Sequence, residues 1–273
     1  MPLVDGGLAW FKACRPVQGF EPRLTADLGR RWPGLVTHVL AFDEERRWLL
    51  TADAGQPIEW STEVLPRWLE MLPRYAELQI GEAARTADHL AHGVPDLRLE
   101  TLDQRFEELV ATDLPMEPDE LRALRAFAPR FSAACMELAA RHPVSTLQHD
   151  DLHGRSVHDD RGTLRVLDWG DAGIGHPLFS MVRLDLSLGE TKGAPGRDRW
   201  FPRLRDAYLE PWGPSAPDLR GAFDLAQGLG RIVHTFTWLR HRTAMPAASR
   251  PDFDRLFAGV LRGALAAAVD LGV

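Results

Sequence analysis

The sequence predicts an α+β protein with two lobes: a small strand-rich lobe over residues 1–54 and a larger, mainly helical lobe over residues 55–273. Three observations lead to this prediction. Short apolar runs separated by charged or glycine-containing turns occupy the first lobe, as is typical of antiparallel strands. A small, polar, turn-forming segment at 52–57 is typical of a linker. Beyond it, apolar residues recur at intervals of three and four, which indicates amphipathic helices.

The first lobe is expected to begin with a β-hairpin that carries Lys12 on its second strand. Its strands are the apolar runs 3–4 and 8–11, which flank the turn signal Asp5-Gly6-Gly7. A helix is then expected over 22–31, because Pro22 suits a first helical turn. Two further strands are expected on either side of a charged turn, at 36–42 and 47–51.

In the second lobe, the clearest predicted helix carries a buried stripe formed by Leu121, Leu124, Ala128, Phe131, Cys135 and Leu138. Pro129 lies inside this stripe and is expected to kink the helix. Further helices are expected over 218–242 and 252–271. Three tryptophans are expected in the core or in a pocket: Trp200, Trp212 and Trp238.

Composition excludes several classes of protein. Of the 273 residues, 32 are Lys or Arg and 39 are Asp or Glu, so the net charge of -7 argues against nucleic acid or an acidic membrane as a partner. The most apolar stretch, 256–273, contains Arg262 and Asp270 and is too short to cross a bilayer. The two cysteines lie far apart and no signal peptide is indicated, so a reduced, cytoplasmic setting is expected.

The segment 147–171 concentrates the residues that can carry chemistry. A turn at 159–162 separates two strand-like runs, 157–158 and 163–167, which are expected to pair as a hairpin. That hairpin would crowd four carboxylates and two histidines into one site: Asp150, Asp151, Asp168, Asp171, His149 and His153. Such crowding is costly unless a cation or a proton relay uses it, although any one of these aspartates can instead be a solvated turn residue.

The same residues resemble the catalytic loop and metal-binding segment of the aminoglycoside phosphotransferase and choline kinase family. The resemblance is carried by His149-x-Asp151, by the five-residue step to position 156, and by Asp168-Trp169-Gly170. It extends to Phe11-Lys12-Ala13, Phe20-Glu21 and His176-Pro177. It implies a protein-kinase-like fold, and an activity that moves the γ-phosphate of ATP or GTP to a hydroxyl group of a small molecule with Mg²⁺ as cofactor.

The resemblance also implies roles for individual residues. Asp151 would be oriented toward the acceptor hydroxyl, and His149 would brace the loop through hydrogen bonds. Asp168 would bind Mg²⁺, and Ser156 stands where the family usually has an asparagine that binds a second metal ion. These roles fit phosphoryl transfer, which needs an orienting group at the hydroxyl and cations across the phosphates. For His153, a buried structural role is favoured over contact with substrate.

Lys12 is set apart by composition. Only Lys12 and Lys192 are lysines among the 32 basic residues, so a lysine at the end of an apolar strand suggests a need for a compact positive charge. By the resemblance, Lys12 would contact the nucleotide phosphates and Glu21 would be its ion-pair partner. The alternative for Lys12 is a lysine on an edge strand without a function. The alternative for Glu21 is an exposed acid in a first helical turn, where acids are favoured in any case.

Two features depart from the family pattern. Ser156 has a shorter side chain than asparagine, and Gly154-Arg155 adds a bulky cation beside the metal site. Only eleven residues precede Lys12, so the front strands and the phosphate-covering loop are expected to be missing. Both features favour an alternative function, which is a kinase-like protein that binds a nucleotide or a small ligand with impaired transfer.

A third possible function and the nature of the acceptor are open at the level of sequence. The third function is a metallohydrolase that holds Zn²⁺ or Mn²⁺ through His149, His153, Asp150 and Asp168. An acidic pocket would suit an aminoglycoside or another polyamine as acceptor, and three acids could line it: Asp171, Asp185 and Glu190. The resemblance also allows sugars, choline and amino-acid-like alcohols, and fold alone does not choose among them.

Overall fold

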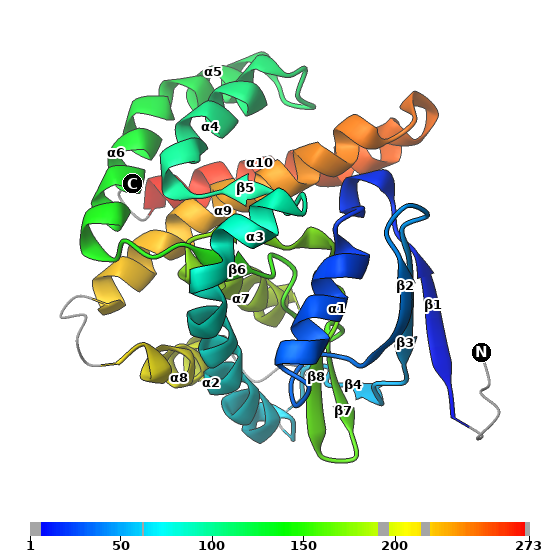
Figure 1. Cartoon of the computed structure of the whole chain (residues 1–273). Helices are drawn as coiled ribbons and strands as arrows, with labels where there is room; N and C mark the ends of the chain where they lie inside the picture. Colours follow the sequence, from blue (N-terminus) through cyan, green and yellow to red (C-terminus); the bar gives the residue numbers. More distant parts are fainter. Residues whose placement is uncertain (1–6, 62, 191–196, 214–218, 271–273) are drawn as a thin grey trace.

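The structure, a computed structural model, describes residues 7–61, 63–190, 197–213 and 219–270. A small sheet with one helix forms the N-terminal region, and helices dominate the rest of the chain (Figure 1). The predicted α+β class and the small strand-rich N-terminal region are therefore confirmed.

The N-terminal sheet has three antiparallel strands, with β3 (Trp48–Ala52) in the centre between β1 (Ala9–Ala13) and β2 (Val39–Asp43). Lys12 lies in β1 and pairs in register with Leu49 of the central strand β3. Burial alternates along β3, so that Leu49 and Thr51 lie on the buried face, as expected for a sheet with one buried side. The elements of this region are β1 (Ala9–Ala13), α1 (Glu21–Arg31), β2 (Val39–Asp43) and β3 (Trp48–Ala52).

The helix and the two later strands predicted for this region are confirmed, with one difference in extent. The strand expected from residue 36 begins only at Val39. Leu35 and Val36 instead join the distant strand β8 (Thr163–Val166), where the Val166 amide donates to the Leu35 carbonyl at 2.7 Å. The first strand of the predicted hairpin, at 3–4, lies outside the described residues.

The described part of the rest of the chain contains nine further α-helices and six short strands. The helices are α2 (Leu65–Glu82), α3 (Thr86–Ala91), α4 (Leu102–Ala111), α5 (Pro118–Ala126), α6 (Ala128–Arg141), α7 (Ser180–Glu190), α8 (Arg197–Leu209), α9 (Leu219–Ala244) and α10 (Arg250–Asp270). The last two match the predicted helices 218–242 and 252–271. Within the described ranges, no helix combines the length and the apolar composition that crossing a membrane requires.

The prediction of one kinked helix through Pro129 is wrong. The chain instead forms two helices, α5 and α6, with Phe127 between them. Pro129 lies in the first turn of α6, where a backbone N–H has no partner within the helix, so proline is tolerated without a kink. The predicted buried stripe is largely present, since Leu124, Phe131, Cys135 and Leu138 are all buried.

The predicted hairpin at 157–167 is confirmed as β7 and β8. Its turn is shorter than expected, because the strands pair as far as Asp160 and Thr163 and leave only Arg161 and Gly162 in the loop. Both loop residues have positive φ, as a two-residue hairpin turn requires. The six short strands are β4 (Gln56–Pro57), β5 (Asp96–Leu97), β6 (Thr146–Gln148), β7 (Val157–Asp160), β8 (Thr163–Val166) and β9 (Gly173–Gly175).

The segment that connects the two regions is held against this hairpin. Strand β4 pairs with β7, and Gly55 just before it has φ of 80°. A Cβ at Gly55 would lie 2.1 Å from the carbonyl oxygen of Asp159, so only glycine allows this close approach. The connection therefore fixes the sheet of the N-terminal region beside the hairpin that precedes Asp168.

One hydrophobic core runs from α1 through α2 to α9 and α10. Trp68 and Tyr75 of α2 are fully buried in it and lie against segments from the second half of the chain, as the stacking of Tyr75 on Trp169 shows. Of the three tryptophans expected in the core or a pocket, Trp200 is buried, whereas Trp212 and Trp238 are half-buried and pack against the core.

Candidate active site

A cavity of about 380 Å³ lies between the N-terminal sheet and the hairpin β7–β8. Trp10, Phe11 and Leu49 form its apolar part. Its charged side chains come from both sides of the cavity: Lys12, Glu21, Asp53, Arg155 and Asp168. The cavity is thus a mainly apolar slot with charged groups on its walls, as expected for a small-molecule site.

Lys12 makes two short contacts at this cavity. Its Nζ lies 2.7 Å from Oε1 of Glu21 and 2.5 Å from Oδ1 of Asp168. Glu21 is buried at the start of α1, where its second oxygen accepts from the Cys14 thiol at 3.3 Å. Burial lowers the pKa of Lys12, but the two carboxylates outweigh it and raise the pKa above its usual range, so Lys12 stays charged. The predicted ion pair between Lys12 and Glu21 is confirmed.

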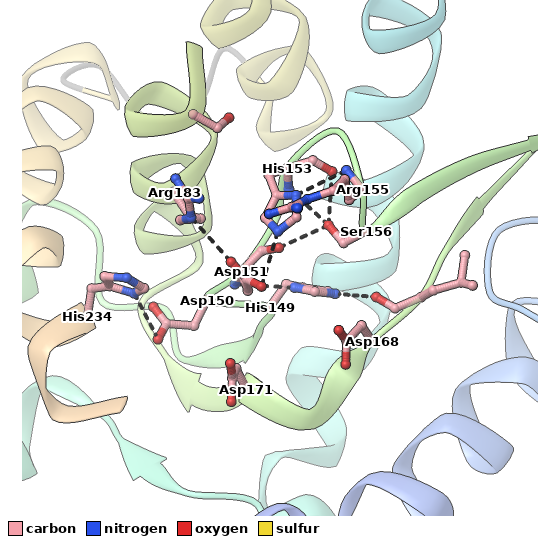
Figure 2. A network of polar contacts seen from close by, with 12 residues as sticks. His149, Asp150, Asp151, His153, Arg155, Ser156, Asp168, Asp171, Arg183 and His234 are labelled. Carbon is pink, nitrogen blue, oxygen red and sulfur yellow. Dashed lines mark hydrogen bonds and ion pairs between the residues drawn. The ribbon is translucent and has the colours of Figure 1, made fainter. Parts of the chain in front are cut away.

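His149 ties together the two segments that carry Asp151 and Asp168 (Figure 2). Its Nε2 donates to the Leu167 carbonyl at 2.7 Å, and its Nδ1 accepts from the Asp151 amide at 3.3 Å. The ring is fully buried, and burial lowers its pKa, so it is neutral with the proton on Nε2. The expected bracing by His149 is confirmed, and both ring nitrogens are engaged in it.

Asp151 is held by two side chains and remains partly open to solvent. Its Oδ2 lies 3.2 Å from Nε2 of His153, and its Oδ1 lies 3.2 Å from Nε of Arg183. His153 Nδ1 accepts from the Arg155 amide, so its proton is on the nitrogen that faces Asp151. Burial raises the pKa of Asp151, but these partners outweigh it and hold the pKa below its usual range. Asp151 is therefore ionised at neutral pH and can accept a proton or a hydrogen bond.

Ser156 is buried and braces the loop from inside (Figure 2). Its Oγ lies 2.9 Å from the Asp151 carbonyl and 3.0 Å from the His153 carbonyl, and it accepts from the His153 amide at 2.9 Å. The hydroxyl would have to give up these bonds to bind a metal ion. This position explains how a short side chain supports the loop.

Asp168 points into the cavity directly after β8. Its backbone has φ of 61°, a left-handed conformation that aspartate tolerates better than most residues. Its side chain is 57% exposed, and Lys12 is its only ion-pair partner in the described part of the chain. An exposed carboxylate of this kind can bind a hydrated divalent cation together with phosphate oxygens.

The expected crowding of four carboxylates into one site is wrong. Asp150 turns away toward α9, where its Oδ2 lies 3.2 Å from Nδ1 of His234. Asp171 accepts from His241 at 2.7 Å, from Gln18 at 3.2 Å and from Arg240 at 3.3 Å. Burial raises the pKa of Asp171, but these donors outweigh it and lower the pKa to about 2. Each acid is thus stabilised by its own partners.

The described residues also do not support the metallohydrolase. Among them no group of three histidine, cysteine or acidic side chains is close enough to hold a metal ion. Both ring nitrogens of His149 are already used, and Asp150 lies against His234 rather than beside Asp168.

The family model of the phosphotransferase enzyme family matches residues 23–222, which is most of the chain. The chain belongs to the phosphotransferase enzyme family. The match contains the loop with Asp151 and the segment with Asp168, and it begins after Lys12 and Glu21. The resemblance drawn from the sequence is thereby confirmed. No curated protein sequence matches the chain.

Solved structures of kinases share the fold of this phosphotransferase. The choline kinase LicA from Streptococcus pneumoniae has 13% identity and a TM-score of 0.60, over 95% of this chain and 86% of that chain. The GDP complex of aminoglycoside 2'-phosphotransferase-IIIa has 15% identity and a TM-score of 0.61, over 97% and 88%. An ethanolamine kinase from Plasmodium vivax has 10% identity and a TM-score of 0.64, over 97% and 77%. The expected protein-kinase-like fold is confirmed, and at these identities the likeness concerns the fold alone.

In this phosphotransferase, the acids expected to line an acidic acceptor pocket are paired with basic side chains. Asp185 is buried between Arg197, at 2.5 Å, and Arg231, at 3.0 Å. Glu190 lies 3.2 Å from Arg183. With Asp171 also paired, each of the three acids has at least one basic partner within the chain.

Sequence reasoning missed the helical residues that contact the loop with Asp151 and the acids beside it. Arg183 of α7 contacts Asp151, and three residues of α9 contact the neighbouring acids: His234, Arg240 and His241. The available signal was the placement of charged residues in otherwise apolar helical stretches. Spacing alone could not show which acid each of them faces.

Proposed function

We propose that the protein transfers the γ-phosphate of ATP or GTP, bound with Mg²⁺, to a hydroxyl group of a small molecule. The observation that carries this proposal is the bridge through His149, which fixes Asp151 relative to the strand end at Leu167. The next residue, Asp168, meets Lys12 at the wall of the cavity. In this proposal, Asp151 orients the hydroxyl, Asp168 binds the metal ion and Lys12 binds phosphate, and the contacts above set the relative positions of the three side chains.

In this proposal the nucleotide occupies the 380 Å³ cavity, with its base against the apolar part. Lys12 binds the α- and β-phosphates, and Glu21 keeps the ammonium in place from its buried side. Mg²⁺ would be held by Asp168 with phosphate oxygens and water, a donor set that this ion prefers. When bound, it neutralises the charge that develops on the phosphates. Ser156 could bind a second ion only after leaving its loop bonds.

Asp151 orients the acceptor hydroxyl and takes its proton. The acceptor oxygen forms a bond to the γ-phosphorus as the bond from phosphorus to the β-phosphate oxygen breaks, and the nucleoside diphosphate leaves. His153 and Arg183 keep the Asp151 carboxylate ionised and aimed until that step.

A second candidate function is a kinase-like protein that binds the nucleotide and transfers phosphate poorly. The observation in its favour is Ser156, whose hydroxyl is engaged within the loop. The two candidates differ in turnover and not in nucleotide binding, so phosphate transfer to water or to an alcohol distinguishes them.

Calorimetric titration tests nucleotide binding, which both candidate functions require. We expect wild-type protein to bind ATP or GTP only with Mg²⁺, and the Lys12→Ala and Asp168→Ala variants to bind it at least about tenfold more weakly, because each loses a charge-assisted contact. Arg122→Ala and Asp119→Ala on α5, both exposed, are charge-matched controls and should bind as wild type. Mg²⁺-independent binding, or full binding by Lys12→Ala, would contradict the proposal.

A further inference from the structure

We propose that the guanidinium of Arg155 binds the γ-phosphate of the nucleotide and acts as a catalytic residue. This inference rests on the proposed function and adds a residue to it. Arg155 is part of the catalytic loop, between Gly154 and Ser156, and its side chain lines the nucleotide cavity together with Lys12 and Asp168.

The first step of the argument is the balance of charge in the cavity. Lys12 is already paired with two carboxylates, Glu21 and Asp168, so it offers little uncompensated charge. In the described part of the chain, the hydrogen bonds of Arg155 are made by its backbone amide and carbonyl, and none engages its guanidinium. Because a nucleoside triphosphate brings several negative charges, an unpaired arginine on the cavity wall is the available partner for them.

The second step is the position of Arg155 relative to Asp151, the residue proposed to orient the acceptor hydroxyl. Arg155 also lines a second cavity of about 260 Å³, together with His153, Arg183 and Glu190. Arg183 and His153 are the two side chains that contact the Asp151 carboxylate. Arg155 therefore borders both the nucleotide cavity and the cavity beside Asp151. The part of the nucleotide that must approach Asp151 is its γ-phosphate.

The third step is the rigidity of the backbone at this residue. The Arg155 amide donates to Nδ1 of His153 at 3.0 Å, and its carbonyl accepts from Nε2 of His158 at 3.2 Å. Fixing the backbone leaves only the side-chain rotamers to be ordered when phosphate binds, which lowers the cost of the contact. Arginine suits this role because its planar group donates two parallel hydrogen bonds to phosphate and keeps its charge at any physiological pH.

The test compares nucleotides that differ only in the γ-phosphate. Calorimetry would measure the affinity of wild type, Arg155→Gln and Arg155→Lys for Mg²⁺-ADP and for the Mg²⁺ complex of the β,γ-imido analogue of ATP. We expect Arg155→Gln to weaken binding of the analogue about tenfold or more while changing ADP binding less than about twofold, with Arg155→Lys intermediate. Arg161→Gln, at the exposed tip of the hairpin β7–β8 that follows the loop, is the matched control.

Turnover provides the second readout. Transfer of phosphate from ATP to water, measured as release of inorganic phosphate, should fall by about 100-fold or more in Arg155→Gln, since an arginine that stabilises the transferring phosphate has a large effect on rate. An equal loss of ADP and analogue affinity, or no loss of either, overturns the role of Arg155 and leaves the phosphotransferase proposal intact. A wild-type protein that binds neither nucleotide overturns both.

Discussion

Replacement of Asp151 by asparagine is expected to lower kcat for phosphate transfer by roughly 100- to 10,000-fold, the range that a positioned general base contributes. The substitution keeps the shape of the side chain and its contact with Arg183, and removes the negative charge that accepts the hydroxyl proton. Affinity for the Mg²⁺-nucleotide should change by less than about twofold, because Asp151 does not line the nucleotide cavity.

Single-turnover kinetics on Asp151→Asn would separate the chemical step from nucleotide binding. Asp160→Asn, at the end of β7, is a matched control that should retain wild-type turnover. A variant that keeps full kcat, or one that loses nucleotide affinity and kcat in equal measure, would assign Asp151 to another role.

The second large effect is expected on stability, from Glu82 at the end of α2. This carboxylate is 1% exposed and accepts from three side chains: Arg31, Trp32 and His89. Glu82→Ala is expected to lower the free energy of unfolding by about 3 kcal/mol, because it leaves the buried donors without a partner. Glu77→Ala, at an exposed position of the same helix, should change it by less than about 0.5 kcal/mol.

Glu82 also predicts the direction of a pH effect. Burial raises its pKa, but the hydrogen bonds from His89, Arg31 and Trp32 outweigh it and lower the pKa to about 2, from an ordinary value of 4.5. A depressed pKa means that the carboxylate stabilises the fold fully above pH 4.5 and loses this effect as the pH falls toward 2. Urea unfolding of wild type and Glu82→Ala between pH 7 and pH 2.5 should therefore converge at the acid end. A difference that stays constant over this range would contradict the role of the ionised form.

Local patterns in the sequence were sufficient for much of the fold. The helix α1, the hairpin β7–β8 and the helices α9 and α10 were predicted from periodicity and turn residues, which act over a few positions. Pro129 was ambiguous, because proline both breaks a helix and suits the first turn of a new one. Only the packing of α5 and α6 against the core decides between one kinked helix and two separate helices.

The site could be predicted in part, and for a physical reason. His149, Asp151 and Asp168 lie on one hairpin and its approach, so their proximity follows from local pairing. The partner of Asp150 and the basic partners of Asp171 come from α9, 69 or more residues further along the chain. The packing of the whole core determines which face of α9 meets the loop, and a short sequence pattern does not predict that packing.

The direct contact between Lys12 and Asp168 has a consequence for ligand choice. In the free protein, the Asp168 carboxylate is paired with the Lys12 ammonium, which is the group that a phosphate would contact in the proposed function. A nucleotide without a metal ion could displace the Asp168 carboxylate from Lys12 only by leaving that carboxylate unpaired beside the negative charge of the phosphates. A nucleotide that carries its own cation satisfies both side chains at once. If the protein binds nucleotide as proposed, this ion pair would therefore favour the metal-bound nucleotide over the metal-free anion.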